Sequence, residues 1–113
     1  RGPEDKRLPF ADAEPGMAGA ETLLSTTLTL MRDGVIDLPR AFDLLAGAPA
    51  RLLGVDAGAI REGYEGDIAL VDPEKPWVVD RRKMAATADN TPFDGQPMQG
   101  RVLGLWKGGV RVD

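Results

Sequence analysis

The side chains that most often carry chemistry are missing from this chain, which contains no histidine and no cysteine. Without imidazole or thiolate, a zinc site would need carboxylates alone, and a Ser-His or Cys-His nucleophile is impossible within the chain. Ser25 therefore has no base to activate it. Several carboxylates remain as candidate acid–base groups, but nothing in their spacing selects a pair: Glu4, Asp5, Asp12, Glu14, Glu21, Asp72 and Asp94. We expect no catalytic residue and no metal ligand in this chain.

One short stretch could instead bring backbone close to a ligand. The residues from Glu14 to Gly19 form a predicted turn, Glu-Pro-Gly-Met-Ala-Gly. Glycine at positions 16 and 19 lets the main chain approach a ligand with no side chain in between. An ordinary surface connection explains the same residues, and their spacing alone does not decide between the two.

Composition limits the possible partners. The chain has 113 residues, of which 42% are hydrophobic, and this is the size of one modest domain. Its net charge is −4 and its basic residues do not gather on one element, so nucleic acid is not expected as a partner. We expect no signal peptide, the sequence has no apolar run of membrane-spanning length, and the lack of cysteine agrees with the expected cytoplasmic location. Because Arg1-Gly2-Pro3 is not a translation start, we expect a piece of a longer protein.

Helices are predicted in the first half of the chain. Apolar side chains recur at helical spacing over residues 20–33, and Gly34 is a good C-terminal stop. Asp37 can cap a second helix that Gly47 ends, and a short third helix follows over residues 49–54. The expected buried positions are Leu23, Leu24, Thr27, Leu28 and Met31 in the first helix, and Ala41, Phe42, Leu44 and Leu45 in the second.

Short strands are predicted in the second half. Gly63 and Gly66 frame a tight turn, and the apolar run over residues 68–71 indicates a strand covered on both faces that Asp72-Pro73 stops. Near the end of the chain, Lys107-Gly108-Gly109 joins two strands as a hairpin turn, because adjacent glycines permit the turns that such hairpins favour.

Taken in order, several motifs resemble the dihydroorotases of the amidohydrolase superfamily. Residues 15–22, Pro-Gly-x-x-Gly-x-Glu-Thr, resemble the segment after the eighth barrel strand. Residues 48–54 are similar to that family's N-P-A-x-x-L-G, and residues 58–72 to the strand that returns the chain to its small β-sandwich. Residues 89–93 match a K-N-T-P-F loop, with aspartate in place of lysine, and residues 102–112 resemble the closing hairpin.

The resemblance implies an α/β fold in two parts. Residues 1–57 would form the last active-site loop and the outer helices at the C-terminal end of a (β/α)8 amidohydrolase barrel. Residues 58–113 would supply strands of the small β-sandwich domain. The N-terminal part of the same protein would be missing from this chain.

The resemblance also implies a function. Such enzymes reversibly hydrolyse dihydroorotate to N-carbamoyl-L-aspartate in de novo pyrimidine biosynthesis, using one or two zinc ions. Their metal ligands and catalytic aspartate would all precede this chain, and a homo-oligomer is expected. What remains here is substrate binding by Arg1, Pro15 and Gly16. Many family members have histidine at the position of Arg1, where arginine can hold a carboxylate through two hydrogen bonds, and phenylalanine at that of Pro15.

Three alternatives stay open. Because Arg1 and Pro15 depart from the family pattern, a non-catalytic dihydroorotase-like scaffold that partners aspartate transcarbamoylase fits the same motifs. Another cyclic amidohydrolase, of the dihydropyrimidinase or allantoinase type, fits as well. A self-sufficient binding module is the remaining alternative. The residues upstream of Arg1 would discriminate, since the active enzyme needs its histidines there.

Overall fold

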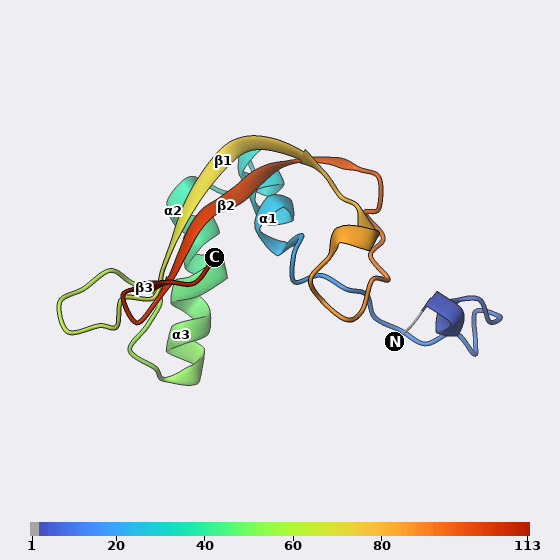
Figure 1. Cartoon of the computed structure of the whole chain (residues 1–113), viewed down its shortest axis with the longest axis horizontal. Helices are drawn as coiled ribbons and strands as arrows, with labels where there is room; N and C mark the ends of the chain where they lie inside the picture. The colour runs from blue at the N-terminus through green and yellow to red at the C-terminus, as the bar shows by residue number, and fades with distance from the viewer. Residues whose placement is uncertain (1–2) are drawn as a thin grey trace.

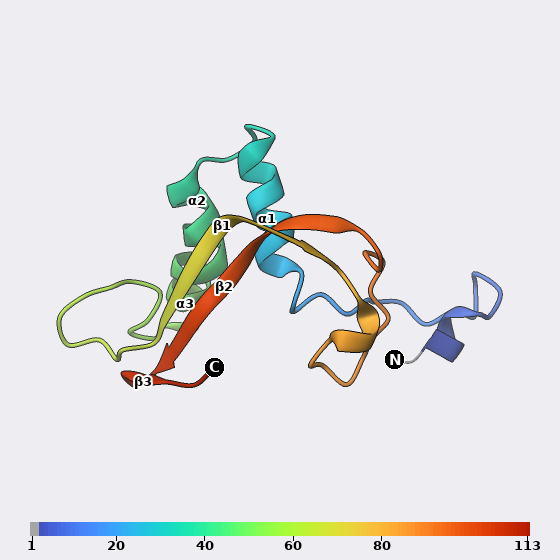
Figure 2. The same cartoon turned by 45° about the horizontal axis from the view of Figure 1, so that its top comes forward.

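The protein's structure, a computed structural model, describes residues 3–113 and combines short helices with one antiparallel sheet. The helices are α1 (Leu23–Arg32), α2 (Leu38–Phe42) and α3 (Ala48–Leu53), and the strands are β1 (Ile68–Val78), β2 (Pro97–Lys107) and β3 (Val110–Arg111), in the order β1-β2-β3. The long β1–β2 ribbon arches over α1 (Figure 1). The tilted view in Figure 2 shows the helices gathered together and the N-terminal segment extending away from them. Helices with an antiparallel sheet agree with the predicted α/β class.

The predicted helices form, with one difference in how they end. Gly34 follows α1 with a φ of 76°, and the Asp37 carboxylate accepts a hydrogen bond from Arg40 N (2.9 Å), which caps α2 as expected. The prediction that Gly47 ends the second helix is wrong, because a π-helical turn over Asp43–Gly47 leads directly into α3. A Cβ on Gly47 would lie 2.6 Å from Asp43 Oδ1, so a larger residue there would have to displace the Asp43 side chain.

The buried face of α1 is more polar than its apolar stripe predicts. Leu28 and Thr27 are buried as expected, but Leu23 is 54% exposed, and Thr22 and Ser25 point inward instead. The sheet explains this difference, since it presents polar groups to the helix. Ser25 Oγ donates to the carbonyl of Gly100 (2.8 Å) and accepts from Trp77 Nε1 (2.9 Å). In the second helix Ala41 is buried, whereas Phe42 and Leu44, also predicted to be buried, are exposed in this chain.

Strand β1 runs further than its sequence predicts. It passes through Asp72 and Pro73 and ends at Val78, with an irregularity in its pairing to β2 between Asp72 and Pro76. Proline is tolerated because β1 is an edge strand and the prolines fall at this irregularity, where no ladder donor is required. The expectation that residues 68–71 are covered on both faces is also wrong within this chain, since Leu70 is 53% exposed.

The C-terminal hairpin forms as predicted, with Gly108 and Gly109 both at positive φ. The Asp67 carboxylate fixes this hairpin. It accepts from Gly108 N (2.8 Å) and from Lys107 Nζ (2.9 Å), and these two bonds lower the pKa of Asp67. Gly109 N in turn donates to the carbonyl of Gly66 (3.0 Å). The turn before β1 and the turn after β2 therefore support each other.

The chain leaves much apolar surface uncovered. Its accessible area is 8230 Å². A folded monomer of 12.1 kDa is expected to expose only roughly 6,000 Å². Exposed large hydrophobic side chains include Leu52, Leu53 and Ile60, and the largest fully buried one is Leu28. No helix in residues 3–113 is long and apolar enough to cross a membrane.

The contact between α1 and β2 gives a first prediction. Gly100 has a φ of 106°, and a Cβ there would lie 2.5 Å from Leu28 Cδ1. Gly95 also has a positive φ of 77°, but no heavy atom lies within 4 Å of its Cβ position. In the complete protein, Gly100→Ala should cost about 1–3 kcal/mol more than Gly95→Ala, because it adds overpacking to backbone strain. Denaturant unfolding of both variants measures the difference, and equal losses would contradict this packing.

Asp67 gives a prediction in pH. Its folded-state pKa lies below the ordinary value of 3.8, so its contribution to stability is present above pH 3.8 and is lost as the pH falls through the folded-state pKa. Asp67→Asn should therefore lower the melting temperature at pH 7. The gap between variant and wild type should close in acid. A gap that stays constant down to pH 3 would show that the charge of Asp67 is not what holds the hairpin.

Candidate functional site

The Pro15-Gly16 turn predicted to approach a ligand is exposed and held from one side. Gly16 has a φ of 98°, a conformation that favours glycine, and its Cβ position is open. The Lys6 ammonium donates to the carbonyl of Glu14 and to the carbonyl of Gly16 (2.6 Å). We call this pair of hydrogen bonds the Lys6 bridge. It links the start of the described chain to the turn across an otherwise irregular loop.

A second loop, distant in sequence, meets this turn. Asn90 Nδ2 lies 3.5 Å from the carbonyl of Gly16, at the outer limit of a hydrogen bond. The two loops line a shallow, open hollow of about 460 Å³, which we call the cationic hollow. Its lining residues are Lys6, Arg7, Gly16, Met17, Arg81, Asn90, Thr91 and Pro92. Two of the motifs identified in the sequence therefore come together in space.

The loop that carries Asn90 is anchored at both ends. Val79, 1% exposed, donates through its amide to the carbonyl of Gln96 (3.0 Å) and accepts from Gly95 N (2.7 Å). Within the loop, Thr91 Oγ1 accepts from Phe93 N (3.2 Å). These bonds satisfy main-chain groups that would otherwise need water, so the loop has a defined shape beside Gly16.

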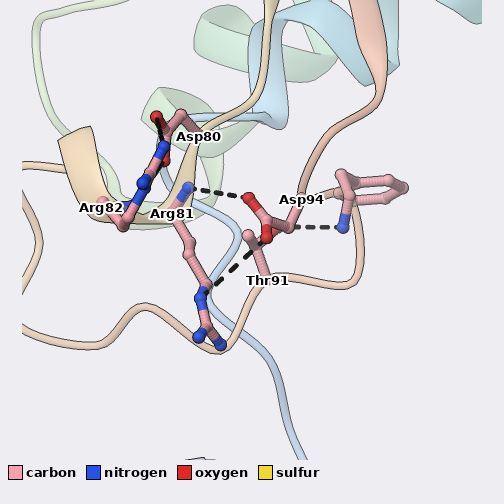
Figure 3. A network of polar contacts seen from close by, with 6 residues as sticks. Asp80, Arg81, Arg82, Thr91 and Asp94 are labelled. Atoms are coloured by element: carbon pink, nitrogen blue, oxygen red, sulfur yellow. Dashed lines mark hydrogen bonds and ion pairs between the residues drawn. The ribbon is translucent and has the colours of Figure 1, made fainter.

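The charges around the hollow are unevenly distributed. Lys6, Arg7 and Arg81 line it, whereas the nearby Asp94 carboxylate is directed to Arg81, accepting from its main-chain amide (2.9 Å) and lying 4.0 Å from its Nε (Figure 3). The neighbouring Arg82 is held by Asp80. Asp94 offsets one of the three cations that line the hollow, and the surplus of positive charge that remains there favours an anionic ligand of low molecular weight.

The Asp80–Arg82 pair beside the hollow is a structural contact. Arg82 Nε and Nη2 each lie 3.0 Å from a carboxylate oxygen of Asp80, in a two-bond arrangement (Figure 3). This side-chain hydrogen bonding lowers the pKa of Asp80 and raises the pKa of Arg82. Because the two charges satisfy each other, neither is the group we expect to bind a ligand.

A second hollow, of about 580 Å³, lies between the helices and β1 but offers little chemistry. Phe42, Ile60, Ile68 and Val71 give it an apolar lining. Its Asp43 carboxylate is already paired with Arg40 and with Arg51, both at 2.9 Å. An apolar surface with its charges internally satisfied suits contact with protein better than binding of a small anion. We therefore place the candidate site at the cationic hollow.

Sequence reasoning found part of this site. Gly16 lines it, and Pro15 precedes Gly16 in the chain but is not among the lining residues. Arg1, the third predicted substrate-binding residue, falls outside the described residues. Lys6 and Arg81 were missed, because nothing in their spacing connects them to the turn. Asn90 was noticed only as part of a motif. In the described part of the chain, no group of three acidic side chains is close enough to hold a metal ion, so these residues do not fit a zinc site.

Known proteins resemble this chain over most of its length. It is 38% identical over 101 residues to a dihydroorotase from Citrifermentans bemidjiense, covering 89% of this chain and 24% of that protein. It is also 38% identical over 109 residues to a dihydroorotase from Geobacter metallireducens, covering 96% of this chain and 26% of that protein. The chain thus spans about a quarter of the length of these relatives.

Solved structures of related enzymes share the fold. A D-hydantoinase superposes with a TM-score of 0.84 at 25% identity, covering 96% of this chain and 24% of its own. A dihydropyrimidinase from Brevibacillus agri superposes with a TM-score of 0.73 at 26% identity, covering 79% of this chain and 20% of its own. The sequence pattern of the amidohydrolase family matches residues 11–112. Because that match takes in almost the whole chain, the protein belongs to the amidohydrolase family.

Proposed function

We propose that this chain is the C-terminal part of a zinc-dependent dihydroorotase, which reversibly hydrolyses dihydroorotate to N-carbamoyl-L-aspartate in the cytoplasm. The meeting of the Pro15-Gly16 turn and the Asn90 loop at a cationic hollow is the observation that carries this proposal. Dihydroorotate carries a carboxylate, which suits a site lined by cations. The relatives named above as dihydroorotases support this choice of substrate.

The uncovered apolar surface supports the proposal that this chain packs against another part of the same protein. In the proposal, residues 1–57 contribute the last active-site loop and outer helices of a (β/α)8 barrel, and residues 58–113 contribute strands of a small β-sandwich. The apolar hollow and the exposed Leu52 and Leu53 would then contact the remaining part of the same protein. Burying such surface is the main source of folding free energy, so the complete protein should be far more stable than this chain alone.

In the proposed enzyme, this chain binds and orients substrate. Gly16 lets its backbone approach the substrate ring, and Arg1 holds the substrate carboxylate through two hydrogen bonds. Zinc, when bound, would polarise the scissile carbonyl and lower the pKa of a water molecule. Since the described residues do not fit a zinc site, its ligands and the catalytic aspartate would come from the rest of the protein.

A second candidate is a hydantoinase or dihydropyrimidinase type of cyclic amidohydrolase, which the structural neighbours favour. The parent rings of those substrates, hydantoin and dihydrouracil, lack the carboxylate of dihydroorotate. Comparing kcat/KM for dihydroorotate and dihydrouracil with the complete protein separates the two candidates. Activity on neither substrate would favour the non-catalytic scaffold that partners aspartate transcarbamoylase.

The proposed role of Arg1 is tested by its replacement in the complete protein. Arg1→Ala should lower kcat/KM for dihydroorotate about tenfold to a hundredfold, because a charge-assisted hydrogen bond contributes about 1.5–3 kcal/mol. Arg61, an exposed arginine in the loop before β1, provides the control, and Arg61→Ala should change kcat/KM less than about twofold. If Arg1→Ala matches this control, Arg1 does not bind the substrate.

A pair of glycines tests the turn. Gly16 has a positive φ and Gly19 does not. At both positions, no heavy atom lies within 4 Å of the place that a Cβ would occupy. Gly16→Ala should strain the turn by about 1–2 kcal/mol and raise KM for dihydroorotate, because the turn must leave its native conformation. Gly19→Ala should leave KM near the wild-type value. Equal KM values for the two variants would mean that the conformation of Gly16 is not needed for binding.

A further inference from the structure

Lys6 lies outside the residues that sequence reasoning assigned to the site, yet it makes two hydrogen bonds to the substrate turn. Its ammonium reaches the carbonyl of Glu14 and the carbonyl of Gly16, ten residues away. Lys6 is partly buried, whereas Gly16 is exposed. An ammonium has three donors and no acceptor. One donor is used on the carbonyl before Pro15 and a second on the carbonyl of Gly16.

The two bonded carbonyls stand before Pro15 and at Gly16, and so control the conformation of the turn. A trans peptide directs its C=O and its N–H to opposite sides. Holding the carbonyl of Gly16 toward Lys6 therefore directs the amide of Met17 away from Lys6. The residue after Glu14 is proline, which has no N–H, so the Met17 amide is the donor that the bridge orients. Asn90 Nδ2, 3.5 Å from the same Gly16 carbonyl, lies at the outer limit of bonding and adds less.

The cost of forming this turn explains why a bridge is useful. Gly16 sits at a φ of 98°, and glycine loses more conformational freedom on ordering than any other residue. The segment around it has little regular structure. The hydrogen bonds between its main-chain groups include those that Asp12 N (2.8 Å) and Ala13 N (2.9 Å) donate to the carbonyl of Pro9. Without the bridge, the binding of a substrate would have to order the turn, and that cost would weaken binding.

We propose that Lys6 is a positioning residue that preorganises the Pro15-Gly16 turn for substrate. The ammonium does not need to touch the substrate, because its two hydrogen bonds fix the backbone that does. This inference rests on the proposed function for its kinetic consequence. The bridge itself is a property of the chain and can be tested independently of activity.

The kinetic test uses Lys6→Met, Lys6→Arg and Lys75→Met in the complete protein with dihydroorotate. Lys6→Met should raise KM about tenfold with little change in kcat, because substrate must then order the turn. Lys6→Arg retains donors for both carbonyls and should restore KM to within about threefold of wild type. Lys75, exposed on β1, is the control for loss of a positive charge, and Lys75→Met should leave KM unchanged.

Loss of folded protein would give a different pattern. It would lower the apparent kcat through a smaller active fraction and leave KM unchanged, so that result for Lys6→Met would overturn the positioning role. An unchanged KM in Lys6→Met would overturn it too. So would a rise in KM for Lys75→Met as large as that for Lys6→Met, since general electrostatics would then explain the effect.

Amide hydrogen exchange separates failure of this inference from failure of the proposed function. The amides of Asp12 and Ala13 lie within the loop that the bridge closes. They should exchange faster in Lys6→Met than in wild type or Lys6→Arg. If the wild-type protein does not hydrolyse dihydroorotate but exchange responds in this way, the proposed function is wrong and the bridge stands. Unchanged exchange in Lys6→Met would overturn the bridge itself.

Discussion

The structure depends on the contact that α1 makes with β2 at Gly100. Leu28, fully buried, packs where a side chain on Gly100 would stand. The carbonyl of Gly100 accepts from Ser25 Oγ (2.8 Å) and lies 3.1 Å from Trp77 Nε1, whose single hydrogen is shared with Ser25 Oγ, so the buried main-chain acceptor has its partner. The Arg101 guanidinium lies over the indole of Trp77, 3.8 Å from its ring centre. The buried polar groups thus find hydrogen-bond partners at the same contact where Leu28 packs closely against Gly100.

This contact also helps to bring the Pro15-Gly16 turn and the Asn90 loop together at the cationic hollow. Thr22 precedes α1 and is 1% exposed, and its amide and hydroxyl both bond to the carbonyl of Gly19 (3.3 Å), which fixes the chain after the Pro15-Gly16 turn. On the sheet side, Trp77 leads directly to the buried Val79, where the Asn90 loop begins. Glu21 adds a link by accepting from Ala85 N (3.1 Å). The bonds of Thr22 and Glu21 therefore support the site from the start of α1.

The chain separates two kinds of surface. Cationic side chains meet at the hollow beside Gly16, whereas apolar side chains remain uncovered along α2, α3 and the ribbon. The first kind suits a small anion, because main-chain and cationic donors are available within a few ångströms of each other. The second suits a protein surface, because apolar area is best buried against more apolar area. In the proposed enzyme these two surfaces serve substrate binding and assembly with the rest of the protein.

The local features of this protein follow from its residues alone. Helical spacing located α1, the Asp37 cap located α2, and paired glycines located the hairpin, because each depends on a few neighbouring residues. Order and spacing of short motifs indicated the family. The continuation of β1 through two prolines could not be predicted locally, since it depends on the place of β1 at the edge of the described three-stranded sheet. Nor could the inward orientation of Ser25, because its partner on the sheet is a carbonyl. The bridge from Lys6 to Gly16 and the approach of Asn90 likewise could not be predicted locally, since side chains ten and seventy-four residues away are brought to the turn only when the whole chain has folded.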